Sequence, residues 1–312
     1  MVQEAAIGSK GRVTQRGSAA AERAVLWPWG EAEARPPWAA LGVLMVLAAV
    51  LRGIALNQQL WYDEITTLVE FVRQPLGYIV TTYTTQNQHM LYSVLARIST
   101  VALGEQPLAL RLPAVVFGVA TVPALYFCAQ LMTTRREALL ACALLTVSYH
   151  HVWFSQNARG YTGLAFFTLV TTYLLVRGAR EGNRAGTASG VVPASWIWYG
   201  VALALGMYTH LTMGFVAVGQ AVVYVWMLMA RRRELGRWPE NAWAPIAGFV
   251  LAGVLTAAMY APVAGQMLER TLGGSTSRGA PEVARAEWRN PLWLVLETLR
   301  GLGAGSAAVG FV

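Results

Sequence analysis

Long apolar runs separated by short basic segments constrain this chain more than any other feature. A membrane-spanning helix needs about 17 to 25 largely apolar residues. Charged residues make up only 13% of the chain, against about 25% in soluble domains. The sequence therefore predicts an all-α, polytopic membrane protein. The spans are expected near Trp38–Leu56, Leu108–Met132, Ala138–Phe154, Tyr161–Val176, Trp196–Tyr208, Leu211–Ala230 and Trp243–Val263, with a further one from Pro291.

Two of these runs are short and leave an alternative open. The segments at 196–208 and 211–230 could form one re-entrant hairpin, although the polar Tyr208-Thr209-His210 between them favours a tight turn.

The net charge of +8 does not indicate a nucleic-acid partner, because the arginines lie in short clusters between apolar runs. The chain has two cysteines, Cys128 and Cys142, both within apolar runs and without the spacing of metal ligands. Neither a disulfide framework nor a zinc site is predicted. Nucleic acid is excluded as a partner class, and membrane lipids are expected instead.

The basic residues also predict an orientation. They concentrate in the segment before the first span and in alternate loops, which the positive-inside rule places in the cytoplasm. Residues 1–37 lack the apolar core and cleavage site of a signal peptide, so we expect a cytoplasmic tail before a domain at 38–312 that is integral to the cell membrane. The long loop at 57–107 is then extracytoplasmic. The basic residues on the predicted inner side are Lys10, Arg12, Arg16, Arg23, Arg35, Arg135, Arg136, Arg177, Arg180, Arg184, Arg231, Arg232, Arg233 and Arg237.

The outer loop begins with two adjacent carboxylates beside interface-preferring aromatic residues. Asp63 is the only aspartate of the chain, and it follows Trp61 and Tyr62 and precedes Glu64. At the water boundary an ionised carboxylate costs little compared with roughly 3 kcal/mol at mid-bilayer. This position suits contact with the head group of a lipid-linked substrate.

The remaining unusual polar residues fall on the same predicted side. All four histidines, His89, His150, His151 and His210, lie outside. Within the outer loop, Ile65–Arg73 and Met90–Leu103 show apolar residues at helical spacing, which predicts two amphipathic helices at the membrane surface. Asp63 and His89 lie at their starts, where unpaired backbone N–H groups favour anions. Together these segments indicate one outward-facing polar chamber.

Five segments carry a resemblance to a known family. They are LWYDE at 60–64, QHMLYSVL at 88–95, ALRLPAVVFG at 109–118, SYHHVWFSQNARGYTGL at 148–164 and MYTHLTMGF at 207–215. In this order they resemble the polyprenyl-phosphate-dependent glycosyltransferases of the GT-C fold. More narrowly, the chain is similar to the branch of glycosyltransferase family 39 that includes protein O-mannosyltransferases and the aminoarabinose transferases of lipid A.

The resemblance implies an integral membrane enzyme with a GT-C-like helix bundle. Such an enzyme moves a sugar from a polyprenyl-phosphate donor to a hydroxyl of a lipid, protein or glycan, with inversion, on the outer face. Asp63 matches the catalytic aspartate, and Glu64 stands beside it as a second catalytic candidate. Arg159 is the expected phosphate holder, because a guanidinium matches phosphate oxygens. Substrate or phosphate contacts are also expected from Tyr161, Gln156, His89, His210 and His151.

Simpler roles stay open for several of these residues. Asp63 and Glu64 could be a solvated loop start, Arg159 a membrane anchor, and His151 a helix cap. Arg52 and Arg111 are expected to pair with carboxylates or to contact lipid phosphates.

Cofactors and metals are not expected. With one aspartate in the chain, the Asp-x-Asp metal arrangement of some GT-C enzymes is absent. Asp63, Glu64 and a histidine could still form a weak divalent-metal site. Catalysis without metal is the prediction.

Two other function classes remain at this stage, a lipid or solute transporter or flippase and a non-catalytic membrane scaffold. Inverted repeats and charged mid-membrane helices would favour transport, and neither is visible. Relatives continue beyond the point where this sequence stops, so we expect their C-terminal part to be missing. The sugar and the acceptor are not specified by the sequence.

Overall fold

A computed structural model describes residues 36–85, 88–181, 192–238 and 242–272. Within these ranges the chain is helical and contains no strand, which confirms the all-α prediction. The elements are α2 (Trp38–Gly53), α3 (Tyr62–Thr66), the π-helical η1 (Thr67–Val72), α4 (Leu76–Thr81), α5 (Met90–Leu103), α6 (Pro107–Ala129), α7 (Arg135–Val147), α8 (Tyr149–Ser155), α9 (Tyr161–Glu181), α10 (Ala194–Thr209), α11 (Met213–Leu235), α12 (Ala244–Tyr260), the 3₁₀-helical η2 (Ala261–Val263) and α13 (Ala264–Leu272). The tail at 1–35 and the span expected from Pro291 lie outside the described residues.

Every apolar run predicted between residues 38 and 263 lies in helical structure, but the run at 138–154 is divided at Ser148 into α7 and α8, and not every helix has the length of a span. In the described part, α6, α9, α11 and the helical stretch Ala244–Glu269 that begins with α12 are long and apolar enough to cross a membrane, and the pair α7 and α8, bent by 60°, would be a fifth span. Helices α2 and α10 have 16 residues each, so they reach about 24 Å against a hydrocarbon core of about 30 Å. The segments at 196–208 and 211–230 are two helices that meet at His210.

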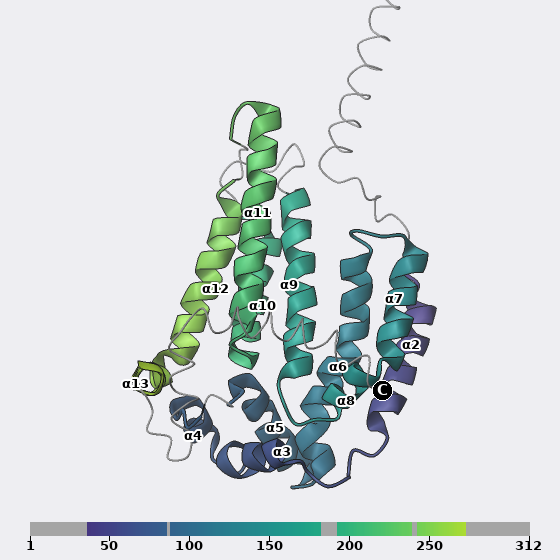
Figure 1. Cartoon of the computed structure of the whole chain (residues 1–312), viewed down its shortest axis with the longest axis vertical. Coiled ribbons are helices and arrows are strands. Elements are labelled where there is room, and N and C mark those ends of the chain that lie inside the picture. The colour runs from purple at the N-terminus through teal and green to yellow at the C-terminus, as the bar shows by residue number, and fades with distance from the viewer. Residues whose placement is uncertain (1–35, 86–87, 182–191, 239–241, 273–312) are drawn as a thin grey trace, which may run out of the picture. The chain divides into compact units, whose positions relative to one another are not determined.

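The helices up to η2 form one compact unit, and residues from Gly265 onward form another, of which only the rest of α13 is described. In the first unit, α2, α6 and α7 pack together, and α9, α10 and α12 pack together. The contact of α6 with α9 joins these groups. The short helices α3, α4, α5 and α8 lie at one end of the long helices (Figure 1).

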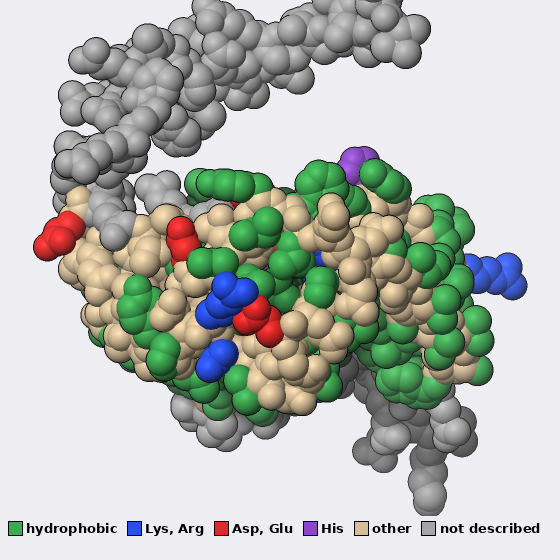
Figure 2. All heavy atoms as spheres, turned by 90° about the horizontal axis from the view of Figure 1, so that it is seen from below, with side chains coloured by type: hydrophobic (Ala, Val, Ile, Leu, Met, Phe, Trp, Pro, Cys, Tyr) green, Lys and Arg blue, Asp and Glu red, His purple; other side chains and the backbone are tan. Residues whose placement is uncertain are grey.

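Both helices predicted in the loop at 57–107 are present. Helices α3 and η1 cover the first predicted segment, and α5 has the bounds predicted for the second. Phe71 and Val72 are buried, whereas Ile65 and Val69 are exposed. The exposed pair continues the stripe that Trp61 and Tyr62 begin, and a stripe of this kind suits contact with lipid. Seen from this end, charged side chains are few and lie among hydrophobic ones (Figure 2).

A bend between α7 and α8 turns the chain toward this end of the bundle. Ser148 is in an extended conformation and ends α7. Arg52, fully buried at the end of α2, donates to the carbonyls of Leu145 and Thr146 and to Ser155 Oγ, 3.1 Å away. A guanidinium at a helix C-terminus is favourable because the free carbonyls carry partial negative charge. Arg52 thus ties α2 to both sides of the bend.

Helix α6 approaches this bend closely through a glycine. A Cβ atom added at Gly118 would lie 2.2 Å from Ser155 Oγ and 2.9 Å from Ser155 Cβ. Any side chain here must therefore displace Ser155, and that displacement would also strain the hydrogen bond from Arg52 to Ser155 Oγ.

We expect Gly118→Ala to lower stability by about 1–3 kcal/mol, the usual cost of overpacking. Thermal unfolding in detergent micelles measures the change. Gly253→Ala on α12 is the matched control, because a Cβ there meets nothing within 4 Å. Equal stability of the two variants would contradict the close packing of α6 on α8.

Candidate functional site

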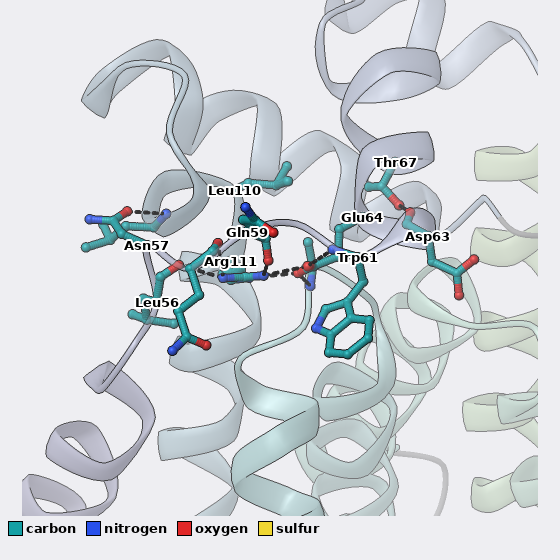
Figure 3. A network of polar contacts seen from close by, with 12 residues as sticks. Leu56, Asn57, Gln59, Trp61, Asp63, Glu64, Thr67, Leu110 and Arg111 are labelled. Atoms are coloured by element: carbon teal, nitrogen blue, oxygen red, sulfur yellow. Dashed lines mark hydrogen bonds and ion pairs between the residues drawn. The ribbon is translucent and has the colours of Figure 1, made fainter.

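The end of the bundle that carries α3 and α8 is organised by a buried ion pair between Glu64 and Arg111. Arg111 donates through Nε to Glu64 Oε1 at 2.8 Å and through Nη2 to Oε2 at 2.6 Å (Figure 3). Glu64 is 0% exposed and Arg111 is 3% exposed. Such a pair is stable in a buried place only if further hydrogen bonds satisfy the remaining lone pairs and protons.

Both partners meet this condition. Glu64 Oε1 also accepts from the Ala158 backbone N–H at 2.7 Å, and Oε2 accepts from the Trp61 N–H at 2.9 Å. Arg111 uses its other protons on the carbonyls of Leu56, Gln58 and Gln59. The ion pair therefore links the start of the outer loop, helix α6 and the segment between α8 and α9.

Unlike its buried neighbour Glu64, Asp63 is exposed. Its side chain is 57% exposed, and its carboxylate points away from the Glu64 and Arg111 network (Figure 3). It lies 3.3 Å from Nη1 of Arg159, whose side chain is only 5% exposed. Because Ala158 is held by Glu64, the same buried pair fixes the backbone beside both Asp63 and Arg159.

Arg159 lies beside a cluster of three rings, those of Tyr161, His89 and His210. Its Nη2 donates to Tyr161 Oη at 3.3 Å, and its guanidinium lies 5.5 Å from the centre of that ring. The ring of Tyr161 in turn lies 5.6 Å from His89 and 5.4 Å from His210. The structure thus brings Asp63, Arg159, Tyr161, His89 and His210 together from loops far apart in the sequence.

His89 is 7% exposed and its Nδ1 lies 3.2 Å from the Thr209 carbonyl oxygen. Burial, and next the charge of Arg159, lower the pKa of His89 from 6.5 to about 3. Gly160 permits this contact, because a Cβ there would lie 2.8 Å from the Thr209 oxygen and 2.9 Å from His89 Nδ1.

His210 is half-buried and has a different partner. Its Nδ1 accepts from the backbone N–H of Thr212 at 3.2 Å, and the Thr212 hydroxyl lies 2.8 Å from the same nitrogen. Burial, followed by the charge of Arg159, lowers the pKa of His210. Both histidines are therefore neutral near pH 7.

The other two predicted binding residues lie against α2. Gln156 donates to the carbonyls of Leu51, Arg52 and Ile54, which are free at the end of that helix. His151 Nδ1 lies 2.7 Å from Nη2 of Arg52. Since a guanidinium only donates, this nitrogen accepts and the proton of the neutral ring is on Nε2. His151 Nε2 is buried without a partner among the described residues and so remains available as a donor.

Among the described residues there is no group of three or more His, Cys, Asp or Glu side chains that could hold a metal ion. Arg159 beside Asp63 adds a positive charge where a cation would have to bind. The donor set therefore fits an anion better than a divalent cation.

The profile of the family described as dolichyl-phosphate-mannose-protein mannosyltransferase matches residues 87–263, which is more than half of the chain. The chain belongs to this family. It is therefore a membrane glycosyltransferase that takes its sugar from a polyprenyl-phosphate donor, which agrees with the resemblance seen in the sequence. No curated protein and no solved structure matches. The match includes His89, Arg159 and His210, whereas Asp63 and Glu64 precede it.

Two features of this candidate site are not evident in the sequence. Asp63 and Glu64 are adjacent carboxylates, and the sequence does not show which of them is buried. In the structure Glu64 is bound by Arg111, and Asp63 is the exposed one of the two. Pairing of Arg111 with a carboxylate was one of the two expectations for it. Gly160 and the Thr209 carbonyl were missed, because a close backbone approach leaves no signal in one sequence.

We expect Glu64→Gln to lower stability by about 3–5 kcal/mol, because one partner of a buried ion pair is left without its counter-charge. Thermal unfolding in detergent micelles is the measurement.

The control is Glu105→Gln in the pair of Glu105 with Arg73, whose side chains are 48% and 50% exposed. Solvent screens that pair, so little change is expected. A loss of stability as small for Glu64→Gln as for Glu105→Gln would show that the buried pair does not hold this end together.

Proposed function

We propose that this enzyme transfers a sugar from a polyprenyl-phosphate donor to an acceptor hydroxyl at the extracytoplasmic surface, with inversion and with Asp63 as the base. The observation that supports this most strongly is the ion pair of the exposed Asp63 carboxylate with the buried Arg159 guanidinium, 3.3 Å apart. It places a proton acceptor next to an anion-binding cation. Mannose is the first donor sugar to test, because the family description names it.

In the proposed step, the acceptor oxygen forms a bond to the anomeric carbon while the bond from that carbon to the phosphate oxygen breaks. The phosphate leaves with the bonding electron pair, and the proton of the acceptor hydroxyl passes to Asp63. A positioned base of this kind typically contributes about 10²–10⁴-fold to the rate. No strong general acid is needed, because the leaving lipid phosphate is a stable anion.

Arg159 supports the leaving-group side of this step. A phosphate that binds its guanidinium competes with Asp63 for the same protons. Donor binding would therefore free the carboxylate for the acceptor hydroxyl. Inversion requires the attacking oxygen and the phosphate on opposite sides of the anomeric carbon, so the ion pair must open to admit the sugar. The exposure of Asp63 and the burial of Arg159 suggest that Asp63 is the partner that moves.

Glu64 and Gln156 fit positioning roles better than contact with substrate. Both oxygens of Glu64 accept hydrogen bonds from within the protein. The amide nitrogen of Gln156 is engaged by carbonyls of α2. Tyr161 and His151 remain candidates for the phosphate, since Tyr161 contacts Arg159 and His151 keeps a free donor.

The membrane side follows from charge and from the exposed aromatics. Helix α7 begins and helix α9 ends at the opposite end of the long helices from α3 (Figure 1), and these two helix ends carry Arg135, Arg136 and Arg177. The positive-inside rule then assigns the end with Asp63 to the outside. Trp61 and Tyr62, 63% and 83% exposed, are suited to the membrane interface beside it.

We expect Tyr62→Cys in intact cells to react with a membrane-impermeant maleimide, because this position is exposed and proposed to be outside. Arg136→Cys is the matched control at the other end, and it should react only after permeabilisation. Background is low, because Cys128 and Cys142 are buried. Labelling of the Arg136→Cys protein alone in intact cells would reverse the proposed orientation.

We expect Asp63→Asn to reduce transfer of radiolabelled sugar from polyprenyl-phosphate mannose by about 10²–10⁴-fold, because the amide cannot take the proton. Glu70→Gln is the control, since Glu70 is an exposed acid on the adjacent η1 helix. Membranes that contain either variant are assayed at an equal level of the enzyme. Full transfer by Asp63→Asn, with the wild type active, would exclude Asp63 as the base.

A further inference from the structure

The hydrogen bonds of His89 determine which of its nitrogens carries the proton. Nδ1 faces the carbonyl oxygen of Thr209 at 3.2 Å, and a carbonyl can only accept. The proton of the neutral ring is therefore on Nδ1. Nε2 then carries a lone pair, and it is buried without a partner among the described residues. Such a buried acceptor is costly unless a ligand supplies a donor.

Where His89 offers a hydrogen-bond acceptor, His210 offers a donor. Its Nδ1 accepts from the Thr212 N–H, so the proton of its neutral ring is on Nε2, which can donate. The two rings lie 4.7 Å apart. One histidine therefore offers an acceptor and its neighbour offers a donor, next to Tyr161 and Arg159.

This combination does not suit a phosphate. Phosphate oxygens without protons only accept, and they would meet the His89 lone pair with repulsion. Hydroxyl groups both donate and accept, so a pair of mixed character fits them. In a glycosyl phosphate the sugar is joined directly to the phosphate, which places its hydroxyls close to whatever holds that phosphate.

We propose that His89 recognises the donor sugar by accepting a hydrogen bond from one of its hydroxyl groups at Nε2, with His210 as the donor for the same or an adjacent hydroxyl. This inference rests on the proposed function, since it takes Arg159 as the residue that holds the phosphate. It makes His89 a specificity-determining residue rather than a phosphate ligand. A polar group that selects for a hydroxyl discriminates strongly against a substrate that lacks it.

The first test reads the tautomer and the contact directly. In protein labelled with ¹⁵N-histidine, the His89 signal is assigned by its absence in His89→Gln. We expect a protonated Nδ1 and an unprotonated Nε2. A short-chain prenyl-phosphate mannose should shift the Nε2 signal, whereas the prenyl phosphate without sugar should not.

The second test uses two variants that each keep one half of the ring's function. In His89→Asn the amide can still donate to Thr209 but lacks an acceptor at the Nε2 position, whereas His89→Gln places an amide oxygen there. We expect kcat/KM for His89→Asn to fall by about tenfold to a hundredfold and His89→Gln to keep most of it. Among single-deoxy donors, wild type should reject one strongly, and His89→Asn should lose that discrimination.

The outcomes separate this proposal from the function on which it rests. If wild type transfers no sugar but the mannosyl donor shifts Nε2, the recognition by His89 holds and the transferase proposal fails. The recognition proposal is overturned if Nε2 carries the proton, if prenyl phosphate alone produces the same shift, or if His89→Asn and wild type discriminate equally among deoxy donors.

Discussion

The buried pair of Glu64 with Arg111 is the interaction on which this end of the molecule depends. Its two charges are far from water, so the pair persists only because all of its remaining groups find partners. Those partners are backbone atoms of the outer loop and of the segment after α8. One ion pair thereby fixes both of these segments. Asp63 precedes Glu64 and Arg159 follows Ala158, and these two side chains face each other.

Two further groups of contacts stabilise this end of the molecule. Arg52 secures the bend between α7 and α8 through carbonyls, Ser155 and His151. The ring group around Tyr161 joins that region to the start of α5 and the end of α10. Gly118 and Gly160 allow close approach of neighbouring segments at these two groups of contacts. The site is thus built from rigid contacts, and the exposed Asp63 is the member least constrained by them.

The surroundings of Arg159 explain how one cation can serve several tasks. Its charge lies beside an acid, a tyrosine and two histidines. The same charge that attracts a phosphate lowers the pKa of both histidines, and burial acts in the same direction. Neutral histidines can bind hydroxyl groups without adding charge, so in the function that we propose phosphate binding and sugar recognition belong to different residues at adjacent positions.

The sequence alone determined the class of protein and the apolar runs from residue 38 to 263 that are helical. It also indicated Asp63 and Arg159 as candidate site residues. Hydrophobicity and helical periodicity are local properties, so a single chain displays them. It did not reveal that α2 ends at Gly53, where Gln156 meets its last carbonyls, because helix ends depend on hydrogen bonding rather than on apolar content. Only the tertiary structure decided which of two adjacent carboxylates is exposed and which nitrogen of His89 faces a backbone carbonyl. Both depend on partners, Arg111 and Thr209, that lie 47 and 120 residues away along the chain.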